Sequence, residues 1–128
     1  MPKYAFGKTV STPYEETLQR ATAALAAEGF GVLTEIDVAA TLKAKLGKDM
    51  EPYNILGACN PQFAHRAIEM EPQIGALLPC NVVVRVEGGR TIVEIMDPHA
   101  VLSLVDKPGI ATVAAEVRER LARVLAAL

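Results

Sequence analysis

The sequence predicts an α+β domain, with a curved, mainly antiparallel sheet of five strands and helices packed on one face. Segments in which apolar and polar residues alternate, as in strands, are interspersed with segments in which apolar residues recur every three or four positions, as in helices. Two strand-like runs are joined by Gly88-Gly89, a strong hairpin signal. From Ile110 onward the apolar residues recur with the spacing of an amphipathic helix. The expected order is β-α-β-(α)-β-(α)-β-β-α, with short helices in brackets.

Composition limits the classes of protein that fit. The 128 residues, 51% of them hydrophobic, suit one domain spanning 1–128. A net charge of −2 offers no basic surface for nucleic acid, and no uncharged stretch reaches the roughly 20 residues that a membrane helix needs. Two cysteines are too few for a disulfide scaffold, and the first residues do not resemble a secretory signal. We therefore expect a cytoplasmic protein with free thiols.

The first two elements are a strand and a helix. Apolar and polar residues alternate over Lys3–Val10, which is typical of a half-buried strand. Thr12 and Glu15 have the spacing of a capping box, with Pro13 at the first helical position. The sequence therefore predicts a helix that Thr12 caps.

This helix is expected to end at Gly29, where a left-handed residue allows Phe30 to fold back on Leu25. A second strand should follow over Phe30–Ile36. Its alternation predicts that one face carries Phe30, Val32, Thr34 and Ile36.

The middle of the chain is predicted to alternate short helices with a strand. The expected elements are a helix capped by Asp37 that ends at Gly47, the strand Tyr53–Cys59, a helix from Asn60-Pro61 to about Met70, and a short helical piece over Ile74–Leu78. Lysines near Gly47 are interpreted as solvated.

A hairpin and a long helix are expected to complete the fold. With a two-residue loop, Glu87 lies opposite Arg90, and one face of the hairpin is apolar. That core face carries Val82, Val84, Val86, Thr91, Val93 and Ile95. The other face mixes apolar and charged residues, so it suits water, a subunit or a ligand. In the last helix, Glu116/Arg120 and Glu119/Arg123 are expected as exposed ion pairs.

Two segments resemble a known family in combination. They are Gly-Ala-Cys-Asn-Pro at residues 57–61 and Leu-Pro-Cys-Asn-Val at residues 78–82. The chain resembles the small bacterial and archaeal proteins of domain-of-unknown-function family 302 over nearly its whole length. The resemblance implies a fold of the TATA-binding-protein-like group and a homodimer, but it implies no activity. A likeness of fold does not transfer DNA binding to a chain of net charge −2.

Cys59 is the first candidate site residue. It precedes the predicted cap Asn60, so its sulfur would lie near the positive end of the following helix, where a thiolate is favoured. The alternative is an inward strand residue that acts as a small hydrophobe. A ligand hypothesis needs no nucleophile, because free N–H groups at that helix end can hold a small anion, with Arg66 or Arg85 as further donors. If Asn60 itself caps the helix, those donors are already used.

His65 and Glu69 are spaced so that, with Cys59, they would form a nucleophile, a base and an orienting group. Their shared helix face also fits a pair of side chains exposed to water. Cys80 is expected on the core face opposite Asp97. A redox pair between Cys80 and Cys59 is not supported by the sequence, which contains no Cys-x-x-Cys motif.

Cofactors and metals find little support in the residue pattern. Asp97-Pro98 is interpreted as a helix cap, with His99 exposed after it. The four soft ligands of the sequence lack the close spacing of a zinc site, so no metal is predicted, and no cofactor motif is present.

Three functions follow. The first is a homodimer that binds a small ligand, anionic or thiol-reactive, through Cys59, Asn60, His65, Arg66 and Cys80. The second is a cysteine-dependent enzyme or redox protein that uses Cys59 with His65. The third is an interaction module in which the mixed hairpin face and the last helix build a dimer.

Overall fold

The computed structural model describes residues 2–128 and confirms the predicted α+β class. In chain order the elements are β1 (Ala5–Val10), α1 (Tyr14–Ala27), β2 (Gly31–Asp37), α2 (Val38–Leu46), β3 (Tyr53–Cys59), α3 (Pro61–Met70), η1 (Pro72–Leu77), β4 (Cys80–Glu87), β5 (Arg90–Met96), α4 (Pro98–Leu102) and α5 (Pro108–Ala126). Within the described residues, no helix has the length and apolar character needed to cross a membrane.

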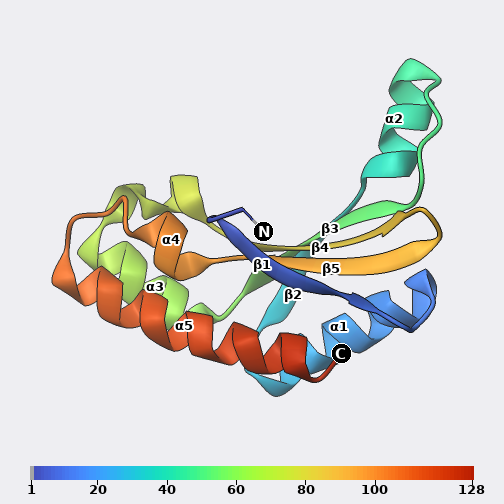
Figure 1. Ribbon diagram of the computed structural model, residues 1–128. Helices are drawn as coiled ribbons and strands as arrows, with labels where there is room; N and C mark the ends of the chain where they lie inside the picture. The colour runs from blue at the N-terminus through green and yellow to red at the C-terminus, as the bar shows by residue number, and fades with distance from the viewer. Residues whose placement is uncertain (1) are drawn as a thin grey trace.

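The five strands form one antiparallel sheet in the order β1-β5-β4-β3-β2. Helices α1 and α5 lie on the same face of this curved sheet, as predicted, and α3 runs beside α5 past the end of β3 (Figure 1). The two middle helices and η1 are insertions between strands, so they do not change the order of the sheet.

The core lies between the sheet and the helices α1 and α5. Its fully buried members come from alternate strand positions and from one stripe of each helix: Leu56, Val82, Val84, Val93, Ile95, Ala21, Leu25, Val113, Leu121 and Val124. The predicted stripe of the last helix is therefore buried. Glu119 and Arg123 form the expected pair, with 3.5 Å between Oε1 and Nη1. Arg120 instead donates to the backbone oxygen of Glu28 at 3.1 Å.

The predicted start of α1 is wrong by one residue. Pro13 holds the N-cap position without a side-chain cap, and the helix begins at Tyr14. The Thr12 hydroxyl instead pairs with the hydroxyl of Thr17, at 2.6 Å between the oxygens. Thr17 is buried, so this tertiary pairing replaces the local capping box.

The predicted end of α1 is confirmed. Gly29 has a φ of 86°, and the Phe30 N–H donates to the Leu25 oxygen at 2.9 Å, which is the long bond of a Schellman motif. Phe30 and Leu25 are both buried in the core.

The predicted single face of β2 is also wrong, because the strand contains a β-bulge. Val32 pairs with Ala58 and Thr34 pairs with Gly57, which leaves Leu33 as an extra residue. A bulge reverses the alternation beyond it. Thr34 and Ile36 therefore lie on the face opposite to Val32, and Leu33 is 68% exposed.

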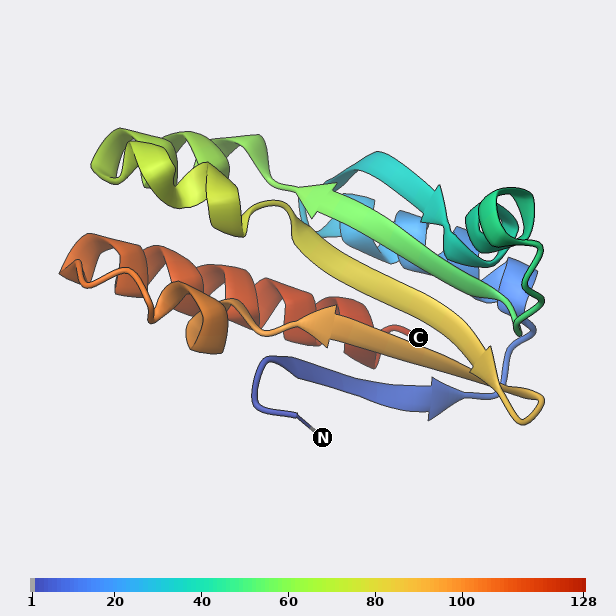
Figure 2. The same ribbon diagram turned by 90° about the horizontal axis from the view of Figure 1, so that it is seen from above.

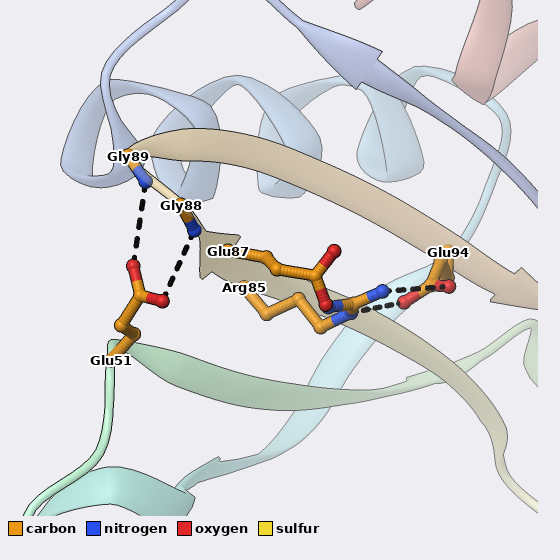
Figure 3. Close-up of polar contacts among 6 residues, drawn as sticks. All are labelled: Glu51, Arg85, Glu87, Gly88, Gly89 and Glu94. Carbon is orange, nitrogen blue, oxygen red and sulfur yellow. Dashed lines mark hydrogen bonds and ion pairs between the residues drawn. The ribbon is translucent and has the colours of Figure 1, made fainter.

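The hairpin has the predicted register, with Glu87 opposite Arg90. Gly88 and Gly89 have φ values of 58° and 78°, as a primed turn requires. Their N–H groups donate to the carboxylate of Glu51, at 3.1 and 3.4 Å (Figure 3). The residues that follow α2 are thus attached to the hairpin turn.

Opposite α1 and α5, the sheet has an open face, on which its outward side chains lie. It carries Thr9, Ile36, Ile55, Val83, Arg85, Glu87, Arg90, Ile92, Glu94 and Met96. Figure 2 looks toward this face, and no helix among residues 2–128 crosses it. On the same side, α2 projects from one end of the sheet (Figure 1). Residues 38–50, which contain α2, are called the α2 arm below.

Candidate functional site: an apolar cavity beside Cys59

A cavity of about 360 Å³ lies at the end of the sheet where β3 leads into α3. Its walls come from β2, β3, α3, η1, the start of β4, α4 and α5. Apolar side chains dominate the lining, among them Phe30, Phe63, Ala64, Leu78, Val113 and Val117. Cys59, Asn60 and Cys80 also line it, so the structure brings together three of the five predicted binding residues.

Asn60 caps α3 as predicted. Its Oδ1 accepts the N–H groups of Gln62 at 3.2 Å and Phe63 at 3.4 Å, while its backbone oxygen accepts the N–H of Ala64 at 2.9 Å. Pro61, the first residue of the helix, has no N–H. Every N–H of the first turn is therefore used within the chain, and this helix end has no free donor for an anion.

Cys59 is the last residue of β3 and is half-buried. Ala58 points into the core, so the alternation of the strand places Cys59 on the opposite face. Cys59 is thus only partly buried, whereas the alternative prediction was an inward residue that acts as a small hydrophobe. The residue lines the cavity.

Cys80 begins β4 and lies on the core face, as predicted, with 6% of its surface exposed. Burial, with a smaller effect from the charge of Cys59, raises the pKa of the Cys80 thiol to about 11. Cys80 pairs with Ala58, so it is close to Cys59 along the sheet but faces the other side. A disulfide needs two Cβ atoms about 4 Å apart, and the opposite orientation does not favour a redox pair.

His65 does not line the cavity. Its Nε2 lies 2.8 Å from Oε1 of Glu69, and the two side chains are 75% and 66% exposed. The spacing thus produces the exposed pair of side chains that was the simpler prediction. The structure does not join His65 to Cys59 in a catalytic pair.

The two arginines considered as anion donors are also outside the cavity. The Arg66 guanidinium lies 5.5 Å from the ring centre of Phe63, on the surface of α3. Arg85 lies on the open face, where its Nε donates to Glu94 at 2.6 Å and its Nη1 to Glu87 at 3.1 Å (Figure 3). These contacts raise the pKa of Arg85, with the Glu94 hydrogen bond as the main cause.

Asp97 caps the short helix α4, as predicted, by accepting the N–H groups of His99 and Ala100. His99 is exposed. Within residues 2–128 no group of three or more His, Cys, Asp or Glu side chains is close enough to hold a metal ion.

Several cavity residues were not predicted. Leu33 lines the cavity only because the bulge turns it there, and a bulge has no signal in this segment of sequence. Val113 and Val117 belong to the stripe of α5 that packs against the sheet. Apolar residues have the same helical spacing whether they pack in the core or line a cavity. The sequence could therefore identify the apolar stripe of α5 but not the cavity beside it.

We expect only one thiol of the folded protein to react with Ellman's reagent at pH 8, and that thiol to be Cys59. With a pKa of about 11, roughly one Cys80 in a thousand is a thiolate at this pH, and burial shields it further. Cys59→Ser should abolish the fast reaction, whereas Cys80→Ser should leave it unchanged. Raising the pH toward 11 should recruit Cys80. Two thiols reacting at equal rates at pH 8 would contradict this assignment.

Comparisons with known proteins agree with the fold. The model of "Domain of unknown function DUF302" matches residues 6–128. A similar solved structure is the crystal structure of an uncharacterized conserved DUF302 protein from Bacillus stearothermophilus, with a TM-score of 0.91 and 35% sequence identity over 98% of each chain. A search of the curated proteins finds no match. With a family match over almost its full length, the chain belongs to the DUF302 family.

Proposed function

We propose that this domain binds a small, neutral, largely apolar molecule in the cavity beside Cys59. The observation that carries the proposal is the cavity itself, whose 360 Å³ lies within the range of about 300 to 1,000 Å³ typical of ligand pockets. Such pockets are mostly apolar, with a few polar groups that orient the ligand. Here Cys59, Thr34 and Asn60 supply those groups.

The rim of the cavity supports an apolar ligand. Leu33 and Ile68 both line it and are 68% and 44% exposed. Large apolar side chains held in water beside an apolar cavity mark a surface that gains free energy when it is covered. The bulge at Leu33 makes this side chain available from an edge strand.

The charges of the site argue against the anionic version of the hypothesis. No Lys, Arg or His side chain is among the lining residues, and the N–H groups at the start of α3 are already bonded. An anion in the cavity would lose its hydration without a cationic side chain in the lining to replace it. We therefore propose a neutral ligand.

The enzymatic alternative is less well supported than binding. A cysteine nucleophile normally needs a base within hydrogen-bond reach, and His65 is bonded to Glu69 on the outer surface of α3. We also propose a reducing, cytoplasmic setting, because both thiols are free and Cys59 is partly accessible.

The test uses the neutral, apolar fluorophore N-phenyl-1-naphthylamine. We expect its fluorescence to rise on binding, the melting temperature to increase with its concentration, and Cys59 to react more slowly with Ellman's reagent. Ala64→Phe, which places a ring in the cavity, should weaken binding at least about tenfold. Ala115→Phe, at an exposed position of α5, is the matched control and should bind normally.

Two results would reject the proposal. One is the absence of saturable binding to the unmodified protein, and the other is equal binding by Ala64→Phe. Inorganic phosphate is a separate arm of the experiment. If phosphate stabilises the protein beyond a matched ionic strength of chloride and the neutral fluorophore does not, the anionic hypothesis is preferred.

A further inference from the structure

We propose that the molecule bound in the cavity is an unbranched aliphatic chain with one neutral polar group at its end, such as a primary alkanol. This inference rests on the proposed function, because it names the chemical class that the cavity beside Cys59 binds. The cavity lies at the end of the sheet opposite the α2 arm, since β3 runs from Tyr53, near that arm, to Cys59. Three features of the cavity support this ligand: its length, the position of its polar groups and its apolar far end.

The cavity is elongated along α3. One face of this helix lines it, through Phe63, Ala64, Ala67 and Ile68. From the cap Asn60 to Ile68 this face spans about 12 Å, at a helical rise of about 1.5 Å per residue. Dividing the volume of about 360 Å³ by this length gives a mean cross-section of roughly 30 Å². A slot of this shape favours a narrow, extended molecule.

Helix α5 forms the opposite wall of the slot and runs antiparallel to α3. Just before α5 begins, the Lys107 Nζ donates to the backbone oxygen of Met70, the last residue of α3, at 2.8 Å. Further along α5, the Arg120 guanidinium lies 5.1 Å from the ring centre of Phe63, near the start of α3. The two helices lie side by side beyond the end of the sheet (Figure 1). The two valines of α5 that line the cavity therefore follow its length.

The polar groups of the cavity gather at one end of the slot. Thr34, Cys59 and Asn60 all lie where β2 and β3 meet the start of α3. A Cβ at Gly57 would overlap the Thr34 hydroxyl, so the glycine leaves room for that hydroxyl beside the strand. Thr34 is exposed, so a polar group bonded to its hydroxyl would also stay in contact with water. This end of the slot suits the polar end of a ligand.

The far end of the slot is apolar and lies between two hydrophobic clusters. Val113 belongs to the cluster that joins α5 to the sheet, whereas Ala67 and Leu102 belong to a second cluster beyond the sheet. All three residues are buried. Among residues 2–128 no polar side chain lines this end, so a second polar group there would lose its hydration without gaining a partner. The ligand therefore has one polar end and one apolar end.

Isothermal titration calorimetry with straight-chain 1-alkanols tests this class of ligand. Each added methylene should tighten binding about fourfold, the factor expected for burying one CH₂ group. The gain should stop at roughly 8 to 10 carbons, when the chain fills a slot about 12 Å long. We expect 1-octanol to bind at least about tenfold more tightly than cyclooctanol, whose ring is wider than an extended chain. Octanoate should also bind at least about tenfold more weakly, because the lining has no cationic side chain.

Substitutions at the two ends of the slot test its orientation. Leu102→Ala should raise the best chain length by about two carbons, because it extends the far end. Leu77→Ala is the matched control, since Leu77 packs against the same second cluster but does not line the cavity. If Leu102→Ala fails to fold by circular dichroism, Ala67→Val, which fills the far end, should lower the best chain length instead. At the polar end, Thr34→Val should weaken alkanol binding roughly two- to tenfold without changing the best chain length.

Equal affinity for 1-butanol and 1-decanol, or for 1-octanol and cyclooctanol, would overturn the inference. A chain-length preference that Leu102→Ala and Leu77→Ala shift equally, or that a folded Ala67→Val leaves unchanged, would also overturn it. If the fluorophore binds and Ala64→Phe blocks it while chain length has no effect, the proposed function stands and only the ligand class is wrong. If neither the fluorophore nor any alkanol binds, the proposed function fails as well.

Discussion

Leu121→Ala is expected to lower the free energy of unfolding by about 2 to 5 kcal/mol. Leu121 is completely buried in the middle of the α5 stripe, where it packs in the cluster that joins this helix to the sheet. Alanine removes the apolar contacts and leaves a void that a rigid sheet and a long helix cannot close. Urea denaturation at one fixed protein concentration measures the difference, because association would add to the apparent stability.

The control for this prediction is Leu104→Ala. The Leu104 side chain is 77% exposed, so the same chemical change should alter the free energy of unfolding by less than about 0.5 kcal/mol. A comparably small effect of Leu121→Ala would show that the α5 stripe is not part of the core.

Replacing both turn glycines, Gly88→Ala with Gly89→Ala, should cost roughly 2 to 4 kcal/mol. Both residues have positive φ, which costs a residue with a Cβ about 1 to 2 kcal/mol. A Cβ at either position meets no atom within 4 Å, so the cost comes from the backbone conformation and not from a clash. The expected result in urea denaturation is a lower midpoint with an unchanged slope.

Two further variants test the reason for that loss. Gly88→Asn should recover part of the stability of Gly88→Ala, because asparagine tolerates the left-handed conformation. Gly31→Ala is the matched control, since Gly31 also has open space around it and has no positive φ. If the turn variants and Gly31→Ala had the same stability, the primed turn would not be the one the protein uses.

Much of the candidate site was predictable because local chemistry defines it. Asn60-Pro61 predicted both the end of a strand and the start of α3, and the cap is formed as expected. The same cap, however, removes the free donors on which the anion hypothesis depended. For His65 and Glu69 the sequence was ambiguous, because their spacing on a helix fits a surface pair as well as a catalytic pair. Their exposure in the folded structure shows that they form a surface pair.

The sequence by itself determined the type and order of the elements, the caps at Asp37, Asn60 and Asp97, and the hairpin register. The spacing of apolar residues, the capping side chains and the turn glycines each depend on only a few neighbouring residues. They can therefore be recognised from a short stretch of sequence. The tertiary structure decided the rest. The bulge at Leu33 depends on pairing with β3, and the cavity beside Cys59 depends on how seven elements meet. The exposure of α2 depends on what the remaining chain leaves uncovered, which is a property of the packed molecule and of no single segment.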